Sequence, residues 1–236
     1  MNTITIQYSF LLAKDKKEIF PLVLDAQNLE LINNPPDDFP RWINLDFHQC
    51  SICPFNVSDT PHCPLALNML DIVNRCDNIL SYDEIHMEVI TKERFISHTT
   101  TAQRGLSSLI GLVIATCGCP HTVFFKPMAR FHLPLSSKEE TIYRATSMYL
   151  LAQYFLKKEN KRPDFQLKGL TKIYKNIELV NKAIITRLRT ATESDSSINA
   201  IIILDAYAKT IPQVIEESLE DLAYLFAPYM KSRESN

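Results

Sequence analysis

The spacing of apolar residues changes along this chain, and this change constrains the fold more than any other sequence feature. In ITIQYSF, residues 4–10, apolar and polar side chains alternate, which is the period of a half-buried strand. IFPLVLD, residues 19–25, is its predicted hairpin partner, and residues 29–32 predict a short third strand. The alternation in residues 82–98 predicts either one bent strand or a second hairpin.

Helical spacing dominates beyond residue 100, and one helix is also predicted before it. Residues 64–76 form that earlier helix, with Pro64 in the first turn, where a missing backbone N–H is tolerated. Residues 99–117 are apolar nearly all round, which predicts a buried central helix. Residues 167–189 carry one apolar stripe, formed by Leu170, Ile173, Ile177, Val180, Ile184 and Leu188.

Two overlapping capping boxes mark the start of a further helix. A capping box pairs a serine with a glutamate three residues later, and the pairs here are Ser136 with Glu139 and Ser137 with Glu140. The helix that follows them is predicted to end at residue 158. More helical segments follow, so the C-terminal half is predicted to be a helical bundle.

These patterns predict an α+β protein: a small N-terminal antiparallel sheet with a buried central helix, followed by a C-terminal helical bundle. Residues 1–120 are expected to form the mixed part, which includes a cysteine-rich loop. Residues 121–236 are expected to form the helical part. No segment with the composition of a linker separates the two parts, so we expect one continuous compact unit.

Glycine is scarce, and its scarcity argues against several common functions. The chain has only four glycines among 236 residues, so neither a GxGxxG motif nor a P-loop can be written. Because those motifs let the backbone approach a nucleotide phosphate closely, a standard ATP- or NAD-binding fold is not expected. The sequence also lacks GxSxG, HExxH and EF-hand patterns.

Charge and hydropathy favour a protein that works away from membranes and nucleic acids. The net charge of −2 gives no overall attraction to nucleic acid or to an anionic membrane. Residues 105–125 contain no charged residue, but a Gly-Cys-Pro break interrupts them before they reach a membrane-spanning length. The N-terminus has no secretory pattern, so we expect a cytoplasmic protein whose cysteines are reduced.

The segment HQCSICPFNVSDTPHCP, residues 48–64, concentrates potential metal ligands. Cys50 and Cys53 have the Cys-x-x-Cys spacing that turns two sulfurs toward one point, and Cys63 follows after nine residues. Cys63 also precedes a predicted helix, whose N-terminus would stabilise a thiolate. We predict that Cys119 closes the site, because it follows the central helix and is again followed by proline.

Zinc is the expected occupant, and four closed cysteine ligands would make the site structural. His48, His62 and His121 are alternatives for the fourth ligand. An iron–sulfur cluster is the second interpretation, since cysteine followed by proline also occurs in ferredoxin cluster segments. Packing alone would explain Cys76 and Cys117, which lie within predicted helices.

The loop over residues 119–132 is a weaker candidate site. It gathers Lys126, Arg130 and His132, and its two cationic side chains would suit an anion such as a phosphate or carboxylate. Packed aromatic side chains and solvated charges in a connecting segment explain the same residues without a ligand.

The run QRGLSSLIGLVIATCGCPHTVFFKPMARFHLP, residues 103–134, resembles an uncharacterised family of bacterial proteins, a domain of unknown function. The segments EETIYRATSMYLLAQYF, CSICP and HCPLALNMLDIV are similar to the same family. The resemblance covers residues 20–160. It implies a bacterial cytoplasmic protein and carries no established activity, so no catalytic residue is transferred.

One principal hypothesis and three alternatives follow. In the principal one, zinc bound by the four cysteines stabilises a binding or regulatory module, which presents its helical part to a protein partner or a second copy. The first alternative is a metal- or thiol-dependent enzyme using the 119–132 loop, with water in the fourth position of a three-cysteine site. The second is an iron–sulfur protein, and the third is an interaction protein without a metal. Neither nucleic acid nor a membrane is an expected partner.

Overall fold

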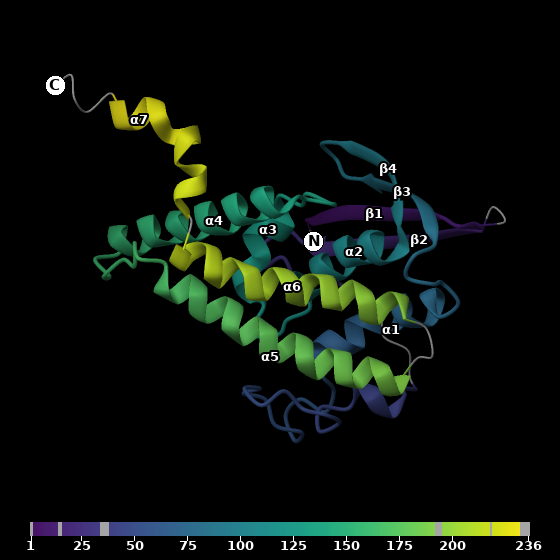
Figure 1. Cartoon of the computed structure of the whole chain (residues 1–236). Coiled ribbons are helices and arrows are strands. Elements are labelled where there is room, and N and C mark those ends of the chain that lie inside the picture. Colours follow the sequence, from purple (N-terminus) through teal and green to yellow (C-terminus); the bar gives the residue numbers. More distant parts are fainter. Residues whose placement is uncertain (1, 14–15, 34–37, 192–194, 218, 232–236) are drawn as a thin grey trace.

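The computed structural model describes residues 2–13, 16–33, 38–191, 195–217 and 219–231. The N-terminal part of the chain forms an antiparallel sheet with the strand order β2-β1-β3-β4 (Figure 1). Its strands are β1 (Thr3–Leu11), β2 (Lys17–Asp25), β3 (Glu84–Ile90) and β4 (Phe95–Thr101). Between β2 and β3 the chain leaves the sheet and forms the cysteine-rich loop and the helix α1 (Pro64–Cys76).

The sheet buries the face that the alternating pattern predicted. Its buried side chains include Ile6, Tyr8 and Phe10 of β1 and Phe20, Leu22 and Leu24 of β2. Strands β3 and β4 pair from Glu84 with Thr101 to Ile90 with Phe95, so residues 82–98 form a hairpin rather than one bent strand.

The prediction of a short strand at residues 29–32 is wrong. In the described residues of this segment, Leu31 forms only an isolated bridge with β2. The carboxylate of Asp25 accepts hydrogen bonds from the backbone N–H groups of Gln27 (2.8 Å) and Asn28 (3.0 Å). These bonds stabilise a turn directly after β2, so extended pairing does not continue.

Helices dominate the chain beyond the sheet. The longer ones are α2 (Ala102–Thr116), α4 (Lys138–Lys158), α5 (Lys168–Ala191) and α6 (Ser196–Glu217). The shorter ones are α3 (Lys126–Arg130), α7 (Ala227–Lys231) and the 3₁₀ segments η2 (Arg41–Ile43), η3 (Val123–Phe125) and η4 (Leu219–Phe226). The α+β prediction is confirmed, and so is the helix predicted over residues 64–76.

Helix α4 begins with one of the two predicted capping boxes. Ser137 is the N-cap residue, and its Oγ accepts a hydrogen bond from the Glu140 N–H at 3.1 Å. The Glu140 carboxylate in turn accepts from the Ser137 N–H at 2.7 Å. The Ser136–Glu139 box is therefore not the one used, because the extended N-cap conformation falls on Ser137.

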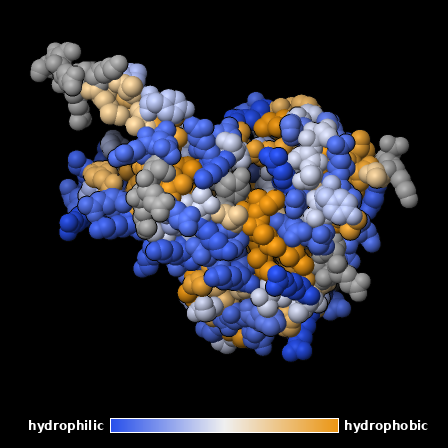
Figure 2. Space-filling view, in the orientation of Figure 1, coloured by the Kyte–Doolittle hydropathy of each residue, from blue (hydrophilic) through white to orange (hydrophobic). Residues whose placement is uncertain are grey.

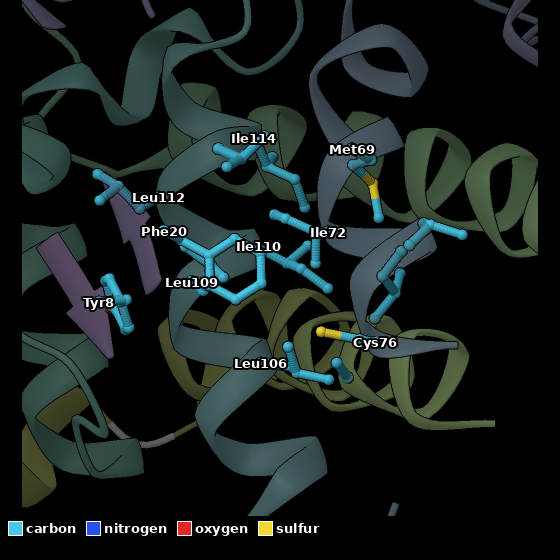
Figure 3. Packing of buried hydrophobic residues seen from close by; sticks show 14 of the residues in the cluster. Tyr8, Phe20, Met69, Ile72, Cys76, Leu106, Leu109, Ile110, Leu112 and Ile114 are labelled. Atoms are coloured by element: carbon cyan, nitrogen blue, oxygen red, sulfur yellow. The ribbon is translucent and has the colours of Figure 1, made fainter. Parts of the chain in front are cut away.

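Helix α2 lies at the centre of the molecule, packed against the sheet on one side and against α6 on the other (Figure 1). Gly105 permits the close approach to β3, because a Cβ atom there would lie 2.7 Å from Cδ1 of Ile85. Figure 3 shows the resulting core, in which side chains of α1, α2 and the sheet meet: Met69, Ile72, Cys76, Leu106, Ile110, Tyr8 and Phe20.

Helices α5 and α6 lie side by side, while η4 and α7 extend away from the body of the molecule (Figure 1). The face in Figure 2 is mainly hydrophilic, with an apolar strip where α2 and α6 lie. No single described helix is long and apolar enough to cross a membrane. The segments Ser196–Val214 and Leu219–Met230 pass that test only as a pair, which is bent by 75°.

Candidate metal centre

Four cysteines from three separate segments line one small cavity. Cys50 and Cys53 come from the loop after η2, Cys63 is the N-cap residue of α1, and Cys119 follows α2. The cavity has a volume of about 30 Å³, and the middle of α5 forms another of its walls. The structure therefore brings together the four cysteines that were predicted from the sequence as ligands.

Local backbone structure holds the cysteine segments in place. The Cys53 N–H donates a 2.9 Å hydrogen bond to the Cys50 carbonyl, and the Cys63 N–H donates a bond of 2.9 Å to η2. Gly118 has a φ of 85°, a left-handed conformation that favours glycine. This conformation turns the chain between the end of α2 and Cys119.

The four thiols share a cavity without closing on one point. Cys50, Cys53, Cys63 and Cys119 form no disulfide bond. Within the described residues, no group of three or more His, Cys, Asp or Glu side chains has an arrangement that would hold a metal ion. A tetrahedral zinc ion would lie about 2.3 Å from each sulfur. The cavity that these thiols line is instead wide enough for a water molecule, which needs about 10–15 Å³.

Arg187 of α5 places a buried positive charge beside this cavity. The residue is 1% exposed and lines the cavity. Its guanidinium donates hydrogen bonds to the backbone oxygens of Trp42 (2.7 Å), Asn44 (2.7 Å) and Leu45 (3.0 Å). In the described part of the chain, no carboxylate forms an ion pair with it. A buried charge of this kind is stabilised by hydrogen bonds and by a nearby counter-charge.

The thiols do not supply that counter-charge while they are protonated. Burial raises the pKa of Cys119 to about 11 and also raises the pKa of Cys50. Neighbouring cysteines act in the same direction, because thiolates placed close together repel one another. The metal-free thiols of Cys50 and Cys119 are therefore neutral at pH 7, whereas metal binding would convert them to thiolates.

Of the three alternative histidine ligands, His121 alone lines the cavity with the cysteines. Its Nε2 lies 2.7 Å from the carbonyl oxygen of Ile52, which fixes the ring beside the CxxC turn. His62 instead packs against Phe39, with ring centroids 4.6 Å apart. His48 is exposed and packs against the ring of the preceding residue.

The three residues proposed for anion binding do not form one site. Lys126 makes an ion pair with Glu30 at 3.1 Å, and the Arg130 guanidinium lies over the Phe131 ring. His132 points inward, where its Nε2 forms a hydrogen bond with the hydroxyl of Tyr8. Burial lowers the pKa of His132 to about 3, so the ring is neutral at pH 7.

Arg187 is a site residue that was not predicted from the sequence, although its position on the apolar stripe of α5 indicates burial. Val180 and Ile184 belong to the apolar stripe of α5, and Arg187 occupies the next position on the same face. Charged side chains are almost never fully buried unless they are paired. An arginine on a buried stripe therefore indicates a specific partner in the interior.

Comparison with known families shows where the chain belongs. A family model matches residues 6–227, a range that includes the four cysteines and Arg187. The chain belongs to this family. The family is described as a domain of unknown function (DUF6901). The match extends at both ends beyond residues 20–160, the range over which the sequence resemblance was expected. The DUF6901 chain has no match among curated proteins and none among solved structures.

Proposed function

We propose that this protein is a metal-binding module whose centre is held by Cys50, Cys53, Cys63 and Cys119. The observation that carries the proposal is that these four cysteines, from three segments, line one cavity. Free cysteines buried only for packing have no reason to converge from separate segments, whereas metal ligands must converge. The centre would tie the cysteine-rich loop to the start of α1 and the end of α2.

The charge of Arg187 supports the same proposal. Four thiolates around Zn²⁺ carry a net charge of −2, and a cubane [4Fe–4S] centre held by four thiolates is also anionic in its usual states. Either group would give the buried guanidinium the counter-charge that neutral thiols lack.

The two candidate occupants require different distances between the cysteine sulfurs. A single zinc ion requires the sulfurs to close to about 2.3 Å from one point, which leaves no space for a water-sized sphere. An iron–sulfur cluster keeps its cysteine sulfurs further apart, because iron and sulfide lie between them. The cavity of about 30 Å³ is wider than a closed zinc site and much smaller than a [4Fe–4S] core requires, so either occupant requires the thiol side chains to move, inward for zinc and outward for the cluster.

A catalytic role has less support than a binding or regulatory role. Four cysteine ligands leave no open coordination position for a substrate. Of the 119–132 loop, Cys119 and His121 line the cavity in the described structure, whereas Lys126 and Arg130 have partners elsewhere. A three-cysteine enzyme site with bound water is the alternative, and it predicts that Cys119 is dispensable for metal binding.

The test is elemental analysis and sulfide analysis of the full chain, purified without oxygen, together with an absorption spectrum. Iron and acid-labile sulfide with broad visible absorption would support the cluster, and stoichiometric zinc without colour would support the structural zinc site. Protein that is fully folded without metal, and that takes up neither metal nor cluster on reconstitution, would refute both.

A further inference from the structure

A second cavity, separate from the cysteines, lies among α2, α4, α5, α6 and the segment around α3. Its volume is about 190 Å³. An engineered protein cavity of about 150 Å³ holds one benzene molecule. The second cavity is therefore large enough for a ligand of about ten non-hydrogen atoms.

We propose that this cavity binds a small carboxylic acid with an aromatic or similarly flat apolar body. Most of its wall would contact that body. Helix α2 contributes Gly111, Leu112 and Ala115, α6 contributes Leu204 and Ala208, and η3 contributes the ring of Phe125. Ligand sites commonly combine such apolar walls with a few polar groups that fix orientation.

Arg144 of α4 supplies the group for the carboxylate. It lines the cavity, and its Nη2 donates hydrogen bonds to the carbonyl oxygens of Met128 (2.9 Å) and Phe131 (3.0 Å). These two bonds fix the guanidinium while its Nε and Nη1 atoms have no hydrogen bond in the described structure. No carboxylate among the described residues forms an ion pair with it. A half-buried arginine without a carboxylate partner suits an anionic ligand, which would accept a hydrogen bond from the free Nη1 or Nε atom.

Tyr174 and Asn181 of α5 add two polar positions to the same wall. Tyr174 is buried, and its hydroxyl makes no hydrogen bond in the described part of the chain. Asn181 is 1% exposed, and its Oδ1 is buried without a hydrogen-bond partner among the described residues. Its Nδ2 faces Asp205 at 3.5 Å, which assigns Oδ1 as the acceptor that is left unsatisfied.

An unsatisfied buried acceptor is unfavourable, so a ligand hydrogen-bond donor would stabilise it. Tyr174 and Asn181 are seven residues apart on one helix, which corresponds to about 10 Å along its axis. One aromatic ring would therefore carry a carboxylate at one end, near Arg144 and Tyr174, and a hydrogen-bond donor at the other end, near Asn181. We select 4-hydroxybenzoate as the probe with this chemistry.

The proposal does not depend on the metal centre, because the two cavities share no lining residue. Neighbouring residues of α5 line different cavities: Asn181 lines the larger cavity, and Val180 lines the cysteine cavity. A loss of metal binding with retained acid binding would refute only the metal proposal, and the reverse result would refute only this one.

The test is a heteronuclear NMR titration of the full chain with 4-hydroxybenzoate, 4-hydroxybenzamide and benzoate at up to millimolar concentrations. We expect saturable shift changes at residues of α2, α5 and α6. The amide, which lacks the charge, should bind at least about ten-fold more weakly, and benzoate, which lacks the donor, about three- to ten-fold more weakly.

Three variants complete the experiment. Ala115→Leu should fill the cavity and abolish binding while the fold is retained. Arg144→Met should weaken 4-hydroxybenzoate at least about ten-fold and bring its affinity to that of the amide. Arg130→Met, which removes a nearby arginine that does not line the cavity, should leave the affinity unchanged. Absence of saturable binding, equal affinity for acid and amide, or unchanged binding in Ala115→Leu would overturn the proposal. The acid–amide comparison uses the unaltered chain, so it remains decisive if Arg144→Met does not fold.

Discussion

The guanidinium of Arg187 donates a 2.7 Å hydrogen bond to the backbone oxygen of Trp42, which lies 145 positions earlier in the chain. The same side chain also bonds the carbonyl groups of Asn44 and Leu45. Through these contacts, α5 holds the segment that leads into the cysteine-rich loop. One residue therefore fixes the geometry of the loop and places a positive charge beside the thiols that the loop carries.

Replacing Arg187 should lower both stability and metal retention. In Arg187→Met three carbonyl oxygens, two of them in buried contacts, lose their charged donor, and we expect the free energy of unfolding to fall by about 3 kcal/mol or more. Trp42 is the single tryptophan of the chain, so its fluorescence during urea denaturation reports the change directly. Arg189→Met, at an exposed position on the same helix, should stay within about 0.5 kcal/mol of the unaltered protein. Equal stability of the two variants would show that the Arg187 contacts contribute little.

Cys119→Ser tests whether the fourth ligand comes from beyond α2. We expect bound metal to fall to background and the loop to lose order, because a structural ligand contributes to folding. Cys117→Ala is the matched control, since Cys117 lies two residues earlier, is buried and does not line the cysteine cavity. Full metal content in Cys119→Ser would instead favour a three-cysteine site, with His121 or water completing it.

Stability should decrease in mild acid because of His132. Burial lowers the pKa of this ring to about 3 in the folded protein, while the ordinary value is 6.5. Between these two values the unfolded chain binds the additional proton, so stability is full above pH 6.5 and falls as the pH drops toward 3. The contribution lost between pH 7 and pH 5 is about 2 kcal/mol.

The measurement for His132 is urea denaturation at pH 7 and pH 5. His132→Gln should be less stable at pH 7 but should lose about 2 kcal/mol less on acidification than the unaltered chain. If both proteins lose the same stability between these pH values, the ring is not held neutral in the folded state.

The capping of α4 gives a prediction at a single-residue level. Ser137→Ala removes the N-cap acceptor for the Glu140 N–H, and we expect a loss of about 1 kcal/mol. Ser136→Ala should have a smaller effect, because Ser136 is not the capping residue of this helix. Thermal unfolding of the two variants compares them directly, and the reverse order would place the cap one residue earlier.

Much of the fold was predictable because local patterns determine it. The alternation around Tyr8 specified β1, and Pro64 after Cys63 specified the start of α1. The segment after Asp25 was not predictable from hydrophobic spacing, because side-chain hydrogen bonds to the backbone turn the chain there. Similarly, both serines at 136–137 fit a capping box, and only the backbone conformation selects one.

The candidate site was predictable in its ligands but not in its surroundings. The Cys-x-x-Cys spacing and the repeated Cys-Pro pairs pointed to four residues, three of them between residues 50 and 63. The contacts between Arg187 and the segment from Trp42 to Leu45 span more than 140 positions, so local pattern does not reveal them. The same limit applies to Asn181, whose unsatisfied oxygen is apparent only once α2, α5 and α6 are packed together.

The most direct test of the metal centre is the content of iron, acid-labile sulfide and zinc in protein purified without oxygen, measured together with its visible spectrum. We expect one four-cysteine centre per chain. A cluster would give about four iron and four sulfide with broad visible absorption, and a zinc site would give one colourless zinc ion. Either metal should be lost in Cys119→Ser and retained in Cys117→Ala. A folded chain that contains neither metal, and that binds neither zinc nor a cluster on reconstitution, would contradict a metal centre at these four cysteines.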